Sequence, residues 1–226
     1  MREVVFLISA LLLTSCAALP VIAPPGDKTE KQLACPSPYS TEKYRFIHAL
    51  DVRRAGQAQT VMVGVTLIDP ALRTISCALV STEGLAFFEA SRGPEGLVVS
   101  RALPPFDAGD FARNMMDDIE LIFFAPREAS VQKGFLAGGE AVCRYKESVS
   151  WIDLWTGRDG RIQIRRYSKR GGLERSVTLA GGANPFSIIE LHASGLFEYE
   201  LFMTLIESEA VPNDPLPEGK AQGPRS

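Results

Sequence analysis

The 226-residue chain has little of what most catalytic and metal sites require. Histidine occurs only at His48 and His192, each in an alternating, strand-like stretch where a histidine is more often a structural group than a base. GxSxG, HExxH, GxGxxG and GxxxxGKS/T motifs are all absent. Two histidines make no His-rich zinc site, and no nucleophile with its base can be assembled around them from sequence. We therefore expect a protein that is not an enzyme and that holds no metal or cofactor.

Cysteine is scarce as well. Besides Cys16, the chain has Cys35, Cys77 and Cys143, and their spacings of 42 and 66 residues fit no zinc knuckle and no CxxC redox motif. In an oxidising compartment these three cysteines allow at most one internal disulfide and leave one thiol over. Cys77 alternates with apolar neighbours along a strand-like stretch, so we interpret it as a small core residue.

The chain has no strong excess of either charge. Its formal net charge is -3 and 23% of its residues are charged, which is ordinary globular composition and suggests no nucleic-acid partner. Basic residues gather between Arg161 and Arg175. On a strand there, one face could meet anionic lipid headgroups, although we favour a solvated outer face with turn charges. That face would carry Arg161, Gln163, Arg165 and Tyr167.

The first 15 residues have the pattern of a targeting segment. The apolar run Val4–Leu13 is too short for a transmembrane helix and has the length of a secretory h-region. The following Leu13–Cys16, LTSC, resembles a bacterial lipobox, which implies that Cys16 is acylated and anchors the protein in a membrane. Ala17 in the next position resembles the sorting pattern for the outer membrane, with the domain facing the periplasm. The alternative is a buried cysteine in an ordinary secretion signal.

Composition divides the rest of the chain into three parts. Residues 16–41 hold five prolines and few large apolar side chains, which predicts a Pro-rich tether able to lift the domain off the membrane. Residues 42–208 have the size and composition of a single domain. Residues 209–226 hold four prolines and no aromatic residue, which predicts a disordered tail.

Strand-like runs separated by short turns fill most of that domain. Connections this short leave no room for crossover helices, so the strands must run antiparallel, and so many of them tend to curl. Before residue 104 the runs are Tyr44–Val52, Val61–Ile68, Arg73–Val80, Leu85–Ala90 and Leu97–Leu103. Later runs are Ser130–Leu136, Glu140–Lys146, Val149–Thr156, Arg161–Tyr167, Leu173–Leu179, Ser187–Ala193 and Leu196–Ile206.

One long segment, Asp107–Phe124, has the helical period instead. Asp107 or Asp110 is expected to cap its start, and Pro126 stops it. We expect its apolar stripe to face the sheet as a lid and, together with two tryptophans of a later strand, to contact a hydrophobic ligand. The residues of this predicted site are Phe111, Met115, Met116, Ile119, Ile122, Phe123, Trp151 and Trp155.

Two features leave alternatives open. Strands such as Val61–Ile68 are apolar on both faces, which fits either a ligand cavity under the helix or a filled core between the helix and a second layer. The carboxylates Asp117, Asp118 and Glu120 do not form a catalytic pair, since the adjacent aspartates point about 100° apart on a helix. We interpret them as a solvated polar face, although Asp118 lies near the apolar stripe and could make a specific contact.

Three segments of the domain carry a family resemblance: the run Val61–Ala90, the helix ending in Asp118–Pro126, and the closing strand Leu196–Ile206. With the lipobox, they resemble the LolA/LolB-like superfamily of periplasmic lipoprotein carriers, and a branch of LolB-like outer-membrane lipoproteins in particular. The resemblance covers most of residues 44–208. It implies a mainly β fold with one or a few helices, in which a large curled antiparallel sheet forms an unclosed barrel with a helical lid.

The same resemblance implies a non-enzymatic carrier or acceptor of acyl chains or lipoproteins. LolB proper has an exposed apolar residue at the tip of an early hairpin, and the corresponding turn here, Ser81–Gly84, has none. Insertion of lipoproteins into the membrane is therefore less well supported than a lipid-binding cavity. The alternative is a scaffold or assembly lipoprotein of the cell envelope with a filled core and no ligand.

Overall fold

A computed structural model describes residues 19–26, 33–54, 57–127, 130–195 and 198–212. Within these residues, strands form one antiparallel sheet in the order β5-β4-β3-β2-β1-β12-β11-β10-β9-β8-β7-β6. The first five strands are β1 (Tyr44–Arg54), β2 (Gln57–Asp69), β3 (Thr74–Val80), β4 (Ala86–Gly93) and β5 (Gly96–Ala102). The others are β6 (Val131–Phe135), β7 (Ala141–Lys146), β8 (Ser150–Thr156), β9 (Ile162–Ser168), β10 (Leu173–Ala180), β11 (Ile188–Ala193) and β12 (Tyr199–Ala210).

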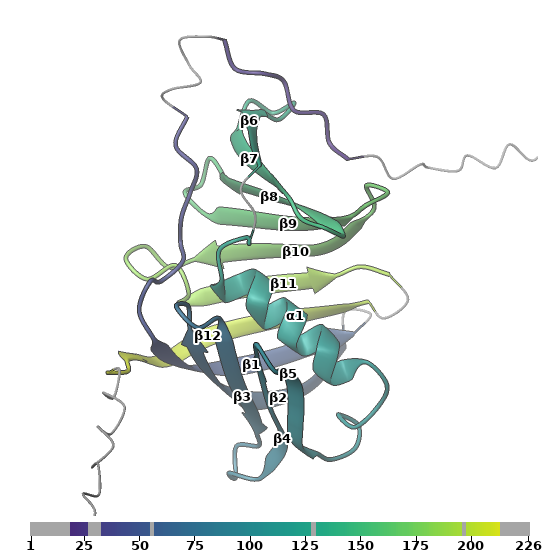
Figure 1. Cartoon of the computed structure of the whole chain (residues 1–226). Coiled ribbons are helices and arrows are strands. Elements are labelled where there is room, and N and C mark those ends of the chain that lie inside the picture. The colour runs from purple at the N-terminus through teal and green to yellow at the C-terminus, as the bar shows by residue number, and fades with distance from the viewer. Residues whose placement is uncertain (1–18, 27–32, 55–56, 128–129, 196–197, 213–226) are drawn as a thin grey trace, which may run out of the picture.

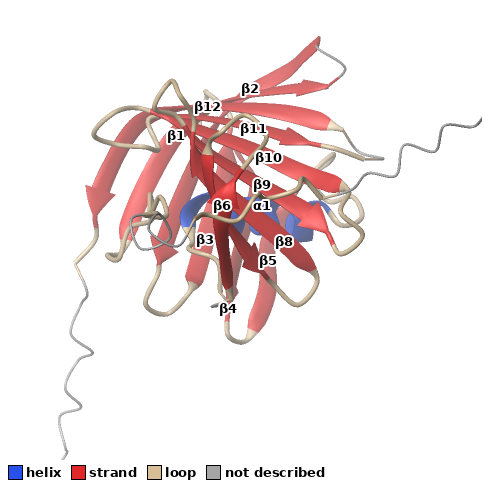
Figure 2. Ribbon diagram, turned by 90° about the horizontal axis from the view of Figure 1, so that it is seen from above, coloured by secondary structure: helices blue, strands red, loops and turns tan. Residues whose placement is uncertain are grey.

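The sheet consists of two meanders joined by the first and last strands. β1 pairs with β12 along most of its length, from Tyr44 opposite Ala210 to Arg53 opposite Glu200. This pairing leaves β5 and β6 as the two edges, so the sheet curls without closing. The helix α1 (Phe111–Phe123) is part of the connection between these two edge strands and lies across the concave face (Figure 1). Seen from above, the strands fan around it (Figure 2).

The helix is shorter than the sequence predicts. It begins at Phe111 rather than Asp107, and Asp110 occupies the N-cap position without a side-chain hydrogen bond to the helix. The Asp110 carboxylate instead lies 3.0 Å from the Arg113 guanidinium, which explains why it does not cap. At the other end the helix stops at Phe123, one residue earlier than predicted, because Phe124 is already extended.

One hydrophobic core fills the space between α1 and the sheet. The inward side of β1 contributes Phe46 and Leu50, at alternate positions as the sequence predicts. Strands of both meanders supply the rest, with Phe88 of β4 and Leu154 of β8 both fully buried. The free cysteine Cys77 is buried in this core, which confirms its interpretation, and burial raises the pKa of its thiol to about 12.

The outward side of several strands is not covered. Val61 of β2 and Ile206 of β12 are more than half exposed, although both belong to the runs that are apolar on two faces. One alternative for strands that are apolar on both faces was a second layer packed on the outer face. The exposure of Val61 and Ile206 shows that such a layer does not explain them. Leu85, which follows the β3–β4 turn, is also exposed, so the apolar residue there lies after the turn rather than within Ser81–Gly84.

Residues 19–26 and 33–43, called the N-terminal strap below, pack onto the domain. Ala23 and Phe135 exchange two backbone hydrogen bonds of 2.9 Å, which adds a short pairing to the free edge of β6. Ile22 and Leu33 are buried, and Cys35 forms a disulfide with Cys143 of β7. This differs from the predicted free tether.

The reason lies in a few residues. Residues 16–41 are rich in proline, but two buried apolar side chains and one disulfide are enough to fix the strap against the sheet.

At the C-terminal end of the domain, β12 runs to Ala210 and the Val211 N–H donates to the Lys43 carbonyl at 2.9 Å, so the domain extends beyond residue 208. The signal peptide, Cys16 and residues 213–226 of the predicted tail lie outside the described residues.

Candidate functional site

The apolar stripe of α1 faces the sheet. Met116, Ile122 and Phe123 are fully buried and Ile119 nearly so, while Phe111 and Met115 are partly buried against the same core. The six helix residues of the predicted site thus lie together on the concave side. In this structure they contact protein side chains, so any ligand on this side would have to displace the stripe.

Aromatic rings tie both ends of the helix to the sheet. Near its start, Phe111 meets Phe88 edge to face with ring centroids 5.3 Å apart. Near its end, Phe123 lies 5.0 Å from Phe46 and 4.9 Å from Phe186, measured between ring centroids. Pairs at these separations contribute about 1 kcal/mol beyond their buried area, which favours the closed position of the helix.

The two tryptophans lie on the other side of the sheet. In β8 the inward residues are Ile152 and Leu154, so Trp151 and Trp155 alternate to the outer face. There Trp155 packs with Ile22 of the strap in a separate small cluster. The predicted site that joins these tryptophans to the helix stripe is therefore not formed. Tryptophan fits a core as well as a ligand cavity, so composition alone could not separate the two faces.

The acidic residues of α1 are not a solvated face. Asp118 is only 5% exposed, and its carboxylate accepts hydrogen bonds from Arg175 Nε of β10 at 2.7 Å and from the Tyr199 hydroxyl of β12. Burial raises the pKa of Asp118, and its two partners counter only part of that rise. The specific contact that the sequence left open for Asp118 is present, and it joins the helix to the C-terminal meander.

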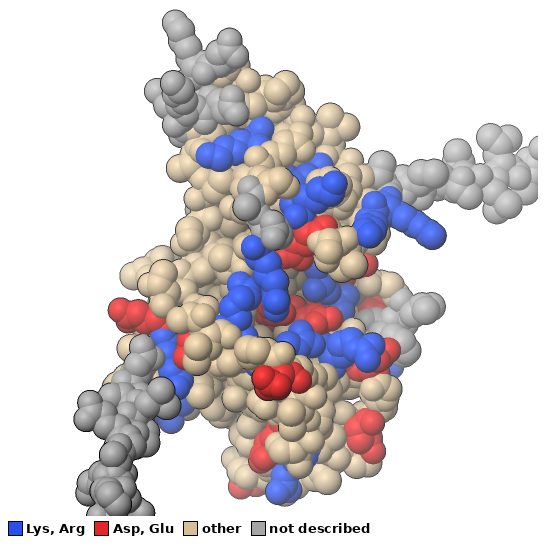
Figure 3. All heavy atoms as spheres, viewed as in Figure 1, with Lys and Arg blue, Asp and Glu red and all other residues tan. Residues whose placement is uncertain are grey.

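Carboxylates on the other flank of the helix bind the N-terminal meander. Arg92 Nη1 of β4 lies 2.5 Å from Asp117, and Arg73 Nη2, between β2 and β3, lies 2.9 Å from Glu120. Arg127 adds a third contact to Glu120, at 2.7 Å. Partial burial alone would raise the pKa of Glu120, but the hydrogen bonds from the two arginines hold it below its usual value. Charged side chains of both signs gather around α1 (Figure 3).

The helix is thus held by charge on two flanks that differ in exposure. The Asp118 side is buried, whereas Asp117 is partly exposed and Arg127 is largely open to solvent. Arg166 also faces inward beside Arg175, opposite it on β9. The face predicted to lie outward included Arg165 but not Arg166, and the Arg165 guanidinium does lie on the outer face, 5.0 Å from the ring centroid of Trp155.

A second buried ion pair, between Arg144 and Asp153, lies on the outer face. The guanidinium of Arg144 donates two hydrogen bonds of 2.6 Å to the Asp153 carboxylate, which is 1% exposed. Sequence reasoning did not predict this pair. The available signal was a carboxylate between two tryptophans on one strand, directly opposite an arginine of the neighbouring strand.

The two histidines have different settings. His48 is buried, and its Nε2 lies 3.0 Å from the Phe186 carbonyl oxygen. Burial lowers the pKa of His48, and its Nδ1 has no hydrogen-bond partner among the described residues. His192 is half exposed, with Nδ1 3.3 Å from a Glu200 carboxylate oxygen. The described residues hold no cluster of three or more metal-binding side chains.

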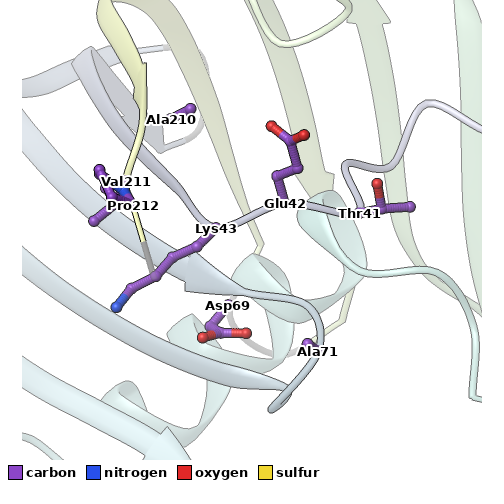
Figure 4. Close-up of a pocket in the computed structure, with 8 residues that line it drawn as sticks. All are labelled: Thr41, Glu42, Lys43, Asp69, Ala71, Ala210, Val211 and Pro212. Atoms are coloured by element: carbon purple, nitrogen blue, oxygen red, sulfur yellow. The ribbon is translucent and has the colours of Figure 1, made fainter. Parts of the chain in front are cut away.

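Two surface pockets lie near the junction of β1 and β12, and neither is lined by α1. One of about 350 Å³ is lined by backbone and side chains around Lys43, Asp69 and Val211 (Figure 4). The other, of about 360 Å³, has Tyr44, Phe46 and Phe186 in its lining. Their volumes are at the small end of ligand sites.

No protein-family model matches the chain, and no curated protein matches it. Among solved structures, one with a similar fold is the crystal structure of a LolA superfamily protein from Nitrosomonas europaea. The two share 10% sequence identity with a TM-score of 0.53, over 77% of this chain and 89% of that chain. The chain has a LolA-like fold. This confirms the predicted class, a mainly β protein whose unclosed antiparallel sheet carries a helix. No helix among the described residues is long and apolar enough to cross a membrane.

Proposed function

We propose that the protein is a membrane-anchored periplasmic lipoprotein that accepts an acyl chain or a lipoprotein-like cargo between α1 and the concave face of the sheet. The observation that carries the proposal is a single amphipathic helix lying across the open side of an unclosed sheet, with its apolar stripe turned inward. The LolA-like fold supports it, because the resemblance implies a carrier of acyl chains. A LolB-like role in the outer membrane rests on Cys16 and its lipobox, which precede the described residues.

Ligand entry requires the helix stripe to move, since Met116 and Phe123 fill the space beneath the helix. Methionine suits such a position because its flexible, polarisable side chain adapts to different neighbours. An acyl chain that replaces these side chains offers the sheet equivalent apolar contacts. Replacing the side chains of the stripe by an acyl chain therefore changes the buried apolar area little. The strength of the ion pairs then determines how easily the helix moves away from the sheet.

The two flanks of the helix predict the direction of opening. The contact between Arg92 and Asp117 is only partly buried, with side chains 18% and 37% exposed, so it is expected to break more easily than a buried pair. Removing one partner of a buried pair costs about 3–5 kcal/mol, so Asp118 and Arg175 stay together. The helix is expected to swing away from the N-terminal meander and to pivot about the Asp118 side.

The test is binding of an environment-sensitive fluorescent fatty acid to the domain lacking its signal peptide. We expect saturable binding that unlabelled fatty acid or a synthetic lipopeptide displaces. The double substitution Asp117→Asn with Glu120→Gln should speed association severalfold by loosening the partly buried flank. Asp110→Asn is the matched control, because its partner Arg113 belongs to the helix itself. Absence of saturable binding in both wild type and variant would contradict the proposal.

A second candidate, a scaffold lipoprotein with a filled core, is favoured by the complete burial of Met116 and Phe123. It predicts that the probe does not bind and that helix variants change stability alone. A protein that co-purifies with the lipidated chain, and that is lost on substitution of exposed residues such as Val61 or Ile206, would support it.

A further inference from the structure

The N-terminal strap is fixed to one edge of the sheet by its backbone. Ala23 pairs with Phe135 of the edge strand β6, and the neighbouring Gly134 lies directly beneath the strap. A Cβ atom on Gly134 would lie 2.3 Å from both the Ala23 carbonyl oxygen and Ile22 Cγ2, far inside van der Waals contact. Glycine is therefore required at this position for the strap to dock, and any larger residue must push it off.

Three further contacts hold the strap on both sides of β6 and β7. Ile22 packs on the outer face with Val142 and Trp155. On the inner side, Lys133 Nζ donates to the Leu33 carbonyl at 2.9 Å, and the disulfide between Cys35 and Cys143 closes the strap covalently. The strap thus wraps around the β6 edge. Figure 1 shows residues 19–26 beside β6 and β7, at the end of the molecule opposite β4, and residues 33–43 running from that end along the sheet to β1.

This attachment shortens the reach of the chain from Cys16. From Cys16 to Ile22 there are 22 − 16 = 6 residue steps, which span at most about 20 Å. If the chain were free up to β1 at Tyr44, the 44 − 16 = 28 steps would span roughly 95 Å. Docking therefore reduces the possible distance between the anchor and the domain severalfold and fixes which part of the domain lies next to the anchor.

We propose that the strap orients the domain, holding the β6–β8 edge of the sheet against the phospholipid headgroups of the membrane that contains acylated Cys16. This rests on the lipid anchor of the proposed function. The β3–β4 turn then points away, because it lies at the end of the molecule opposite β6 (Figure 1), whereas Arg92 beside the β4–β5 hairpin contacts the helix. Docking, rather than a free tether, is what gives the lipoprotein a defined near side and far side.

The chemistry of the near edge suits a headgroup layer. Val21, next to the docked Ile22, is 85% exposed and can enter the interface. Arg158, in the β8–β9 turn, donates to the Gly138 carbonyl of the β6–β7 turn and lies 3.4 Å from the Glu140 carboxylate, yet its side chain is 79% exposed. A long cationic side chain beside exposed apolar groups can reach lipid phosphates while its stem covers apolar surface.

The experiment measures energy transfer from a fluorescent amino acid, placed at Asp159 beside this edge or at the exposed Glu83 in the β3–β4 turn, to acceptor-labelled lipids. The full acylated chain is reconstituted in vesicles of phosphatidylcholine with phosphatidylglycerol. We expect severalfold greater transfer from Asp159 than from Glu83. Gly134→Val should abolish that difference, while Gly26→Ala, where an added Cβ meets nothing within 4 Å, should leave it unchanged.

Equal transfer from both positions in the wild-type chain, or an unchanged difference in folded Gly134→Val, would overturn the orientation. Should Gly134→Val fail to fold, Ile22→Ser releases the strap without altering β6 and must give the same loss. Sedimentation with vesicles tests the anchor separately from the orientation. A Cys16→Ala chain that still carries acyl groups and sediments would contradict the proposed anchor. An anchored chain with no preferred near side would contradict only the proposed orientation.

Discussion

The helix α1 and the N-terminal strap both cover the sheet, but they are held by different kinds of contact. α1 lies on the concave face through apolar side chains and side-chain ion pairs, with no covalent bond to the sheet among the described residues. The strap is joined to β6 by backbone hydrogen bonds and to β7 by a disulfide. The difference teaches that side-chain contacts alone hold one cover, while backbone and covalent bonds fix the other, as the proposed carrier with a fixed orientation requires.

Each cover also lies near one buried ion pair of the sheet. Asp118 belongs to the helix itself and pairs with β10, so it forms the pivot about which the helix is expected to swing. Asp153 and Arg144 belong to adjacent strands on the side that the strap covers, and no motion of the strap separates them. The same chemistry therefore joins the helix to the sheet in one place and two adjacent strands to each other in the other.

The largest effect is expected on removing the disulfide that fixes the strap. Cys35→Ser with Cys143→Ala releases a constraint across 108 residues, which corresponds to a loss of about 4–5 kcal/mol in the free energy of unfolding. Urea unfolding under non-reducing conditions measures it. Cys77→Ala, at a buried thiol outside the disulfide, is the control and should cost about 1 kcal/mol. Equal losses in the two variants would show that the strap contributes nothing beyond core packing.

Removing one partner from each buried ion pair should cost less and should separate the two regions. Asp118→Ala and Asp153→Ala are each expected to lose about 3–4 kcal/mol, because an arginine is left buried without its partner. Amide hydrogen exchange in α1 should accelerate in the first variant and stay unchanged in the second. Acceleration by both variants would mean that the helix and the outer face unfold as one unit.

Truncating one apolar anchor of each cover gives a smaller effect. Met116→Ala is expected to cost about 3 kcal/mol and Ile22→Ala about 2 kcal/mol, from thermal or urea unfolding. The space left under α1 should also raise the affinity for a short fatty acid probe, whereas the space left under the strap should not. An equal gain in affinity from both variants would contradict ligand binding between α1 and the concave face.

The smallest effect concerns pH. His48 has a pKa below its ordinary 6.5 because it is buried, so the unfolded chain binds its proton first as the pH falls. Its contribution to stability is complete above pH 6.5 and is lost as the pH falls through the lowered pKa. Asp118, whose pKa burial raises, contributes with the opposite sign at lower pH.

The difference between wild type and His48→Gln therefore isolates the histidine, measured as the free energy of unfolding between about pH 7 and pH 5. The wild-type chain should lose more stability over this range than the variant does. His192→Gln is the matched control, since that ring is half exposed, and it should behave as wild type. If the stability of the His48→Gln chain depends on pH as much as that of wild type, His48 is not the source of the effect.

The strands and the helix were predictable because each depends on local periodicity. Every strand-like run of the sequence corresponds to an observed strand, such as Val149–Thr156 to β8 and Leu173–Leu179 to β10. Alternation also identifies which residues share a face, as for Phe46 and Leu50. It does not say which face is concave, and for that reason Trp151 and Trp155 were assigned to the wrong side of the sheet.

Contacts between distant segments were the part that sequence could not give. The partner of Asp118 is 57 residues away on another element, and nothing in the spacing of charges points to Arg175. The strap depends on Cys35 meeting Cys143 and on an absent side chain at Gly134, neither of which has a local signal. Such features follow from the pairing of β1 with β12, which brings the two meanders around one helix.

The most direct test of the movable helix and the fixed strap is hydrogen exchange with and without a fatty acid. We predict that saturating probe accelerates exchange in peptides from residues 111–123, while peptides from residues 131–146 and from the strap keep their protection. This result would show that ligand displaces the helix and leaves the β6 edge in place. Binding of the probe with unchanged exchange in the helix, or with loss of protection at the strap, would contradict the account.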